Sequence, residues 1–282
     1  MFFKKTKSSF CPLVGQTVCV CFVLINFGKA NTSDAREYFM KSLGKFLIFA
    51  GQLFVRRESF STYVSLTIDE CIKVGYNSLF IVTIVSVFMG AVTTIQTAYN
   101  LVSPFIPDYV ISLVVRDMTV LELAPTIMAI VYAGKVGSNI AGELGTMRIT
   151  EQIDALEVMG INSTSYLVLP KIIASMLMYP MLVVLSAFLS IYGGYLTSLA
   201  TGIISGHDYI YGIRYDFIEF NIAFALIKAF VFAFLVAAIS AYKGYFTSGG
   251  ALEVGQSSTA AVTNSCIAIL LADYLLAQLL LG

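Results

Sequence analysis

The sequence predicts an all-α integral membrane protein, because the chain is very apolar and its apolar residues are gathered in long stretches. Of the 282 residues, 58% are hydrophobic and 12% are charged, whereas a soluble domain carries about a quarter charged residues. The mean hydropathy is +0.84. The formal net charge is zero, so no excess of basic residues indicates a nucleic-acid partner.

Five apolar stretches are candidate transmembrane helices: residues 79–99, 119–140, 167–200, 221–241 and 261–281. A helix needs about 20 apolar residues to cross the hydrocarbon core, and four of the stretches have that length. The third is longer and contains Pro170 and Pro180, so we expect an extended or kinked helix. The first is followed by Pro104 and Pro107, and it either crosses the membrane or returns as a hairpin.

The N-terminal region has a different pattern. Between Phe39 and about Val55, apolar residues recur at helical spacing among basic residues, which predicts an amphipathic helix in the headgroup layer. Residues 1–39 begin with lysines before a short apolar run, as a signal segment does. We expect residues 1–39 to be an N-terminal extension, signal-like or upstream of a start at Met40, and residues 40–282 to form the membrane domain.

The basic residues predict the orientation of the chain. One side holds Lys41, Lys45, Arg56, Arg57 and Lys73 before the first span, Lys135, Arg148 and Lys171 between the second and third, and Lys243 after the fourth. The opposite loops hold Arg116 and Arg214. By the positive-inside rule, the N-terminus and the loop between spans two and three are cytoplasmic, and the C-terminus is outside.

This cytoplasmic loop contains a polar segment, EQIDALEVMG, from Glu151 to Gly160. With Thr150 as N-cap and Gly160 just past the end, it predicts a helix of about ten residues. One face holds Ile149, Ile153 and Leu156, and another holds Glu151, Asp154 and Glu157. The segment is either an ordinary amphipathic surface helix or a docking helix, whose apolar face fills a partner's groove while its acids set the register.

Three charged residues, Glu122, Lys228 and Asp273, lie inside apolar stretches. An ionised side chain in the bilayer costs several kcal/mol and is normally paired or functional. Lys228 and Asp273 lie about 10 and 12 Å from the outer ends of their spans, so their depths allow an ion pair. The charges form either a structural ion pair or the polar lining, or latch, of a cavity for a lipid headgroup.

Catalytic and metal-binding patterns are lacking in the sequence. None of the five cysteines has zinc-ligand spacing with another, and the single His207 is interpreted as a loop residue. The segment AGKVGS resembles a phosphate-binding loop but lacks the G-x-x-x-x-G-K-[ST] spacing. If transport by this chain uses ATP, the ATPase must therefore be another chain.

The longest distinctive segment, YAGKVGSNIAGELGTMRITEQIDALEVMGINSTSYLVLPKIIA at Tyr132–Ala174, closely resembles the signature of the MlaE family. The similarity continues through IYGGYL at Ile191–Leu196, LIKAFVFA at Leu226–Ala233 and DYLLAQLL at Asp273–Leu280, and it covers about residues 40–282. Members of this family are permease subunits of ABC transporters that move phospholipids and related lipids across the Gram-negative envelope.

The resemblance assigns roles to particular residues. It implies that the polar helix is a coupling helix in a cleft of the ATPase, with contacts from Glu143, Thr146, Arg148, Glu151, Gln152, Asp154, Leu156 and Glu157. It implies an intramembrane lipid pathway that includes Glu122, Lys228, Asp273, Met89, Ile95 and Gln96. Family members often have an arginine where this chain has Leu121. Arg116 and Asp117 lie nearby in the sequence and are candidates to replace it.

The resemblance also implies partners and location. We expect a non-catalytic homodimer in the bacterial inner membrane, with a cytoplasmic ABC ATPase that binds ATP and Mg²⁺, a periplasmic MCE-domain protein and a phospholipid substrate. The permease itself is expected to bind no cofactor and to help maintain outer-membrane lipid asymmetry. The alternatives are an ion-coupled secondary carrier of lipid or a small molecule, against which no inverted repeat is evident, and a lipid-modifying membrane enzyme.

Overall fold

The computed structural model describes residues 60–101, 107–202 and 204–280, together with Gly44, Phe46, Ile48, Phe49 and Gly51, which are helical. The chain divides into two compact units, Met1–Val55 and Arg56–Gly282. The predictions for residues 1–39 lie outside the described residues, and the headgroup-layer position of residues 39–55 stays a prediction. The second unit contains the long apolar helices of the described chain.

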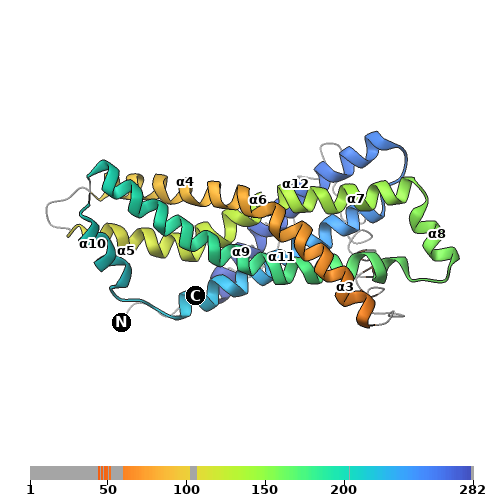
Figure 1. Ribbon diagram of the computed structural model, residues 1–282, viewed down its shortest axis with the longest axis horizontal. Coiled ribbons are helices and arrows are strands. Elements are labelled where there is room, and N and C mark those ends of the chain that lie inside the picture. Colours follow the sequence, from red (N-terminus) through yellow and green to blue (C-terminus); the bar gives the residue numbers. More distant parts are fainter. Residues whose placement is uncertain are drawn as a thin grey trace, which may run out of the picture. The chain divides into compact units, whose positions relative to one another are not determined.

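Every regular element of the described second unit is a helix (Figure 1), which confirms the all-α membrane fold. The α-helices are α3 Phe60–Cys71, α4 Asn77–Asn100, α5 Tyr109–Met118, α6 Met128–Tyr132, α7 Ser138–Ile149, α8 Gln152–Val158, α9 Ser163–Thr201, α10 Gly206–Arg214, α11 Phe220–Tyr245 and α12 Ala251–Leu280. Three π-helical segments, η1 Ile72–Tyr76, η2 Thr119–Ile127 and η3 Ala133–Gly137, connect some of them without a break.

Four helical runs among the described residues are long and apolar enough to cross a membrane: Thr62–Asn100, Ser163–Thr201, Phe220–Tyr245 and Ala251–Leu280. They contain most or all of the first, third, fourth and fifth predicted spans. The second predicted span, residues 119–140, lies in the run from α5 to α7 and is not one of these four.

The first and third spans resolve two alternatives that the sequence leaves open. Thr62–Asn100 is one run of 39 residues, so the first span does not fold back as a hairpin, and the chain turns only after Asn100. Helix α9 also has 39 residues and keeps Pro170 and Pro180 inside it. Its length of about 58 Å exceeds the hydrocarbon core, which confirms the extended helix.

Among the described helices, α4 and α9 pack against each other most extensively, and their backbones approach closely. A Cβ atom added at Gly90 would lie 1.7 Å from the carbonyl oxygen of Ser190, and one at Gly193 would lie 2.4 Å from that of Val87. The Ser190 hydroxyl donates to the carbonyl of Ser86 across the contact, at 2.9 Å. Small residues therefore fix this pair of helices, as is common in membranes.

The polar segment and the opposite connection lie at the two ends of this bundle (Figure 1). Helix α8 joins α7 to α9 at one end, and α10 packs on α5 at the other. Helix α11 returns between them and contacts α7, α9 and α12. The interpretation of His207 as a loop residue is wrong, because His207 lies in the first turn of α10.

Candidate functional site

Lys228 lies fully buried in α11 and contacts carboxylates from two other elements. Its Nζ is 2.6 Å from Oδ1 of Asp273 in α12 and 3.0 Å from Oε1 of Glu122 in η2. The ring centroid of Phe224 lies 4.7 Å from the same nitrogen. The Lys228–Asp273 pair that the span depths allow is therefore present, and Glu122 joins it. We call these three residues the Lys228 triad.

Lys228 also contacts the backbone of η2, the π-helical segment that contains Leu121 and Pro125. Lys228 Nζ donates to the carbonyl of Leu121 at 3.2 Å. The same nitrogen donates to Oε1 of Glu122 at 3.0 Å, while Asp273 is its ion-pair partner at 2.6 Å.

Arg116, a candidate for the headgroup contact because this chain has Leu121 at the nearby position, is held by contacts within its own chain. Its guanidinium is buried and donates to the carbonyls of Ile213, Tyr215 and Asp216, at 2.9, 2.7 and 3.3 Å. It also pairs with Asp117 at 2.9 Å. Arg116 therefore fastens the end of α10 to α5, with four of its five N–H donors in hydrogen bonds.

The three predicted pathway residues of α4 lie apart from the contacts of the Lys228 triad. Met89 is half-buried, and Ile95 and Gln96 are exposed. They share the outer face of α4 with large exposed apolar side chains such as Val92 and Tyr99. Their role in a lipid pathway stays a prediction.

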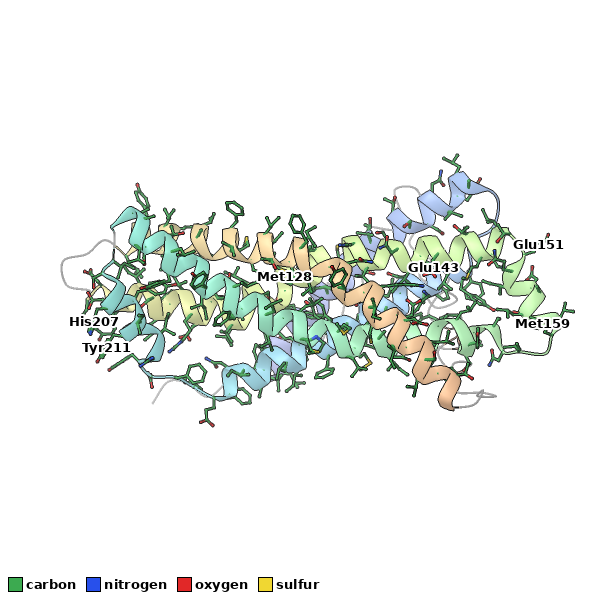
Figure 2. The ribbon with its side chains drawn as sticks, in the orientation of Figure 1. Met128, Glu143, Glu151, Met159, His207 and Tyr211 are labelled. Atoms are coloured by element: carbon green, nitrogen blue, oxygen red, sulfur yellow. The ribbon has the colours of Figure 1, made fainter. Side chains whose placement is uncertain are left out.

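Beside α10, at the opposite end from α8, lies a shallow pocket of about 440 Å³. It is lined by His207, Ile210, Tyr211, Arg214, Tyr215 and Asp216. Figure 2 labels His207 and Tyr211 at this end of the bundle. All of these residues come from one short helix and the turn after it, so the pocket is an open surface hollow.

Helix α8 is shorter than predicted. It has seven residues, and Glu151 stands before it in the left-handed conformation with φ of 59°. Thr150 is not the N-cap, because its hydroxyl turns back to the carbonyl of Thr146 at 2.8 Å. Gly160, with φ of 81°, follows the helix as predicted. The left-handed Glu151 makes the sharp corner between α7 and α8, at a backbone energy of about 1–3 kcal/mol.

The predicted apolar face of α8 is turned into this chain. Ile153 is fully buried, so it does not fill the groove of a partner. Asp154 pairs with Arg148 at 2.6 Å. Oε1 of Glu157 accepts from the hydroxyls of Ser163 and Tyr245, at 2.9 and 3.0 Å. Both acids are nevertheless exposed, and their contact with a partner stays a prediction.

Another surface of α8 remains open. Glu151 and Gln152 are exposed at its start, and Val158 and Met159 are 89% and 66% exposed at its end. Figure 2 shows Glu151 and Met159 at the two ends of this helix. Leu156 is half-buried. An adjacent apolar pair at a helix tip, with polar residues beside it, is suited to contact another protein.

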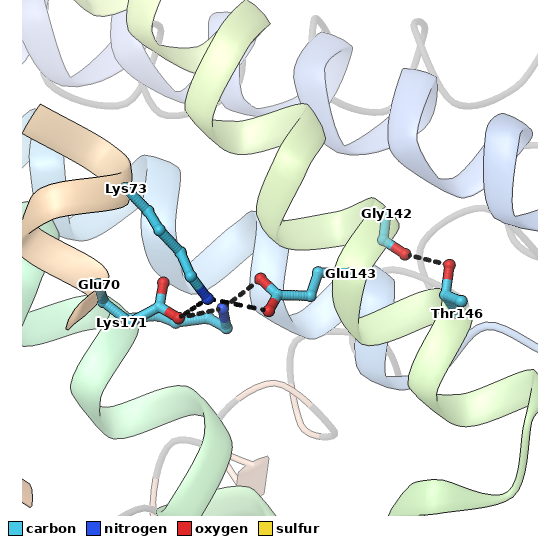
Figure 3. Close-up of polar contacts among 6 residues, drawn as sticks. All are labelled: Glu70, Lys73, Gly142, Glu143, Thr146 and Lys171. Carbon is cyan, nitrogen blue, oxygen red and sulfur yellow. Dashed lines mark hydrogen bonds and ion pairs between the residues drawn. The ribbon is translucent and has the colours of Figure 1, made fainter. Parts of the chain in front are cut away.

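A second ion cluster lies close to α8 (Figure 3). Lys171 Nζ of α9 is 3.0 Å from Oε1 of Glu70 and 2.5 Å from Oε2 of Glu143. Lys73 contacts the same two acids, at 3.1 and 3.6 Å. We call these four residues the ion clasp. Glu143 therefore faces α3 and α9, while the nearby Thr146 hydroxyl donates to Gly142 of its own helix at 2.8 Å.

The ion clasp shifts the acidity of Glu143. Burial would raise the pKa of this carboxyl, but hydrogen bonds and charge from Lys171 and Lys73 outweigh burial and lower the pKa below its usual value. Glu143 therefore stays ionised within the cluster.

Comparison with known proteins gives the context of these clusters. The family model described as Permease MlaE matches residues 67–279, which include the Lys228 triad, the ion clasp and α8. The chain belongs to the MlaE permease family. It is 37% identical to a probable ABC transporter permease protein of Rickettsia bellii over 240 residues, which cover 85% of this chain and 92% of that protein.

Two further relatives extend the comparison. A probable ABC transporter permease protein of Synechocystis is 37% identical over 215 residues, covering 76% of this chain and 81% of that protein. The chloroplastic protein TRIGALACTOSYLDIACYLGLYCEROL 1 of Arabidopsis thaliana is 32% identical over 240 residues, covering 82% of this chain and 66% of that protein.

Sequence reasoning misses part of this MlaE permease's polar network. The patterns do not single out Glu70, and Lys73 and Lys171 contribute only to the predicted orientation. One signal is available: Lys171 follows Pro170 inside the third apolar stretch, and a lysine there needs an acidic partner as much as Lys228 does. The partner's identity is not readable, because Glu70 and Glu143 are distant in the chain.

Proposed function

We propose that this MlaE-family permease is the membrane-spanning subunit of an ABC transporter that moves phospholipid, or a related lipid, between the inner membrane and a periplasmic MCE-domain carrier, maintaining outer-membrane lipid asymmetry. The observation that carries the proposal is the family match across the long apolar helices and α8. A lipid cargo is supported by the Arabidopsis relative, whose name contains a glycolipid.

In this proposal the subunit makes and breaks no bonds. Two copies assemble in the inner membrane with N-termini in the cytoplasm and C-termini in the periplasm, and each binds one cytoplasmic ATPase that holds ATP and Mg²⁺. The ATPase contacts the open surface of α8, at Glu151, Gln152, Val158 and Met159. ATP binding draws the ATPases together, and the permease helices follow because one of their conformations binds the closed ATPases better.

The Lys228 triad serves the lipid pathway by locking η2, α11 and α12 in one of the two conformations. Its charges lie in the outer half of the predicted membrane, where a headgroup would be held. The exposed outer face of α4, with Met89, Ile95 and Gln96, supplies the cavity wall at the interface between the two copies.

An ion-coupled carrier is the second candidate, and the triad is the observation that favours it, because a carboxylate next to a buried lysine can exchange a proton. Membership of a family whose relatives are named ABC transporter permeases weighs against it.

The test is to purify the tagged chain from its native membrane and identify the proteins that accompany it. We expect an ABC ATPase, and we expect Met159→Asp to lose it, because a charge in an apolar contact is unfavourable. The matched control Tyr211→Asp, at the opposite end of the bundle, retains the ATPase. Purification of the wild-type chain without any nucleotide-binding subunit would contradict the proposal.

A further inference from the structure

We propose that the ion clasp is the joint through which movement of α8 reaches α4, and that Lys171 is its central positioning residue. The inference rests on the proposed function, since it assumes that an ATPase moves α8. It goes further by naming the residues that carry the movement from α8 into the helix that faces the lipid.

The ion pair between Glu143 and Lys171 lies near the two ends of α8. Helices α7 and α9 are the two arms that carry α8, and Glu143 and Lys171 join these arms about 9 and 12 Å from the ends that border α8. Any displacement of α8 that moves one arm relative to the other therefore acts directly on this ion pair.

Helix α3 is also joined to this ion pair. Glu70 of α3 contacts the same ammonium group, so α3 is tied to both arms at one point. Lys171 is 4% exposed and Glu70 is 13% exposed. Ion pairs shielded in this way are screened little by salt and hold their geometry more firmly than exposed pairs. When the arms move, α3 must follow, or the buried ammonium group loses an acceptor.

A continuous helical run connects α3 to α4. Helix α3 continues through η1 into α4 as one run that ends at Asn100. A π-helical segment inside such a run often marks a functional position, and η1 begins two residues after Glu70 and contains the clasp residue Lys73. Two contacts hold η1 and its border with α4: Lys135 donates to the carbonyl of Asn77, and a Cβ at Gly75 would lie 2.1 Å from Cε of Met178.

These contacts make the run from Glu70 to Tyr99 a lever about 40 Å long, guided at η1 by α9 and η3. Its far part carries the exposed face with Ile95 and Gln96. The Lys228 triad is not in this path, because it joins η2, α11 and α12. The structure thus separates a transmitting cluster near α8 from a locking cluster deeper in the bundle.

The experiment uses the complete transporter in vesicles, with one spin label at Thr150, exposed at the corner between α7 and α8, or at Tyr99, which is 83% exposed at the far end of α4. In the wild type, ATP should change the spectra of both labels. In Lys171→Met, which removes the ammonium but keeps an unbranched side chain, ATP should still change the Thr150 spectrum but no longer that of Tyr99. Lipid transport should fall about tenfold while ATP hydrolysis continues.

Two controls accompany the measurement. Lys243→Met makes the same chemical change in the last turn of α11, outside the clasp, and should leave both spectra and transport unchanged. Glu143→Gln keeps the shape of the side chain and removes its charge, and it should show the same loss as Lys171→Met in milder form. It also provides a second test if Lys171→Met does not assemble.

The outcomes separate the two proposals. A Tyr99 response to ATP and normal transport in folded Lys171→Met and Glu143→Gln would overturn the joint, whatever the fate of the proposed function. A wild-type transporter in which ATP leaves the Thr150 label unchanged would overturn the proposed coupling through α8 itself.

Discussion

The two almost completely buried lysines, Lys228 and Lys171, each contact two carboxylates but differ in their surroundings. The Lys228 triad is built on one cation, which also donates to a backbone carbonyl. The ion clasp has a second cation, Lys73, which is 57% exposed and contacts both clasp acids. The triad therefore depends wholly on one lysine, whereas the clasp keeps a cation when Lys171 is removed.

This difference predicts unequal losses of stability. Lys228→Met leaves Asp273 without its ion-pair partner and the Leu121 carbonyl without the lysine donor, while Glu122 keeps a hydrogen bond from Thr126. We expect a loss of about 3 kcal/mol, as for other broken buried pairs. Lys171→Met should lose less, because Lys73 still neutralises part of the charge. Thermal unfolding of the two purified variants in the same detergent measures the order. Equal losses, or the larger loss in Lys171→Met, would contradict the comparison.

A charge exchange tests the triad in a second way. The double variant Lys228→Asp with Asp273→Lys should recover part of the stability and transport that Lys228→Ala or Asp273→Ala loses. Recovery should be incomplete, because the new lysine must also reach Glu122 and the carbonyl of Leu121. Comparison of the double variant with both single variants, by unfolding and transport, decides. Failure of the exchange to recover anything would argue against a direct Lys228–Asp273 pair.

Glu151, whose backbone is strained, lies outside both clusters. Its replacement should raise the stability of the chain, by less than the losses expected above. Glu151→Gly should stabilise the chain by about 1 kcal/mol, because glycine adopts the left-handed conformation without a Cβ penalty. Gln152→Gly, one residue later inside α8, should destabilise it by about 1 kcal/mol. Unfolding midpoints that move in the same direction for both variants would show that φ at Glu151 is not the cause.

The smallest predicted effect is a pH dependence at the ion clasp. The pKa of Glu143 is lowered in the folded chain, so its contribution is present above the unfolded pKa of about 4.3 and is lost as pH falls through the folded pKa. Its side chain is 36% exposed, which keeps the contribution below about 1 kcal/mol. The difference in unfolding midpoint between wild type and Glu143→Gln should shrink between neutral pH and pH values below the folded pKa. A constant difference would mean that Glu143 stabilises by packing.

The long helices were predictable because hydropathy averages over many residues and does not depend on tertiary contacts. The same average brought out Lys228 and Asp273, since isolated charges stand out in apolar stretches. The face of α8 that packs was not predictable, because an amphipathic helix shows the same spacing whether its apolar side meets its own chain or a partner. Ile153 proves to meet its own chain.

Contacts that depend on helix irregularity also escaped the sequence. Leu121 lies in the π-helical η2, and only the packing of α11 shows that Lys228 donates to its carbonyl. The ion clasp brings Glu70, Glu143 and Lys171 together from separate helices, and no local spacing encodes that meeting. Arg116 looked available for a headgroup because its backbone acceptors lie in residues 213–216, far along the chain.

The central claim is that this MlaE permease moves lipid when an ATPase acts on α8. Its most direct test is transfer of labelled phospholipid out of vesicles containing the permease, its ATPase and an acceptor, with ATP or with a proton gradient as the energy source. The account predicts transfer with ATP, no transfer with the gradient alone, and loss of ATP-driven transfer in Met159→Asp. Transfer driven by the gradient without the ATPase would contradict it.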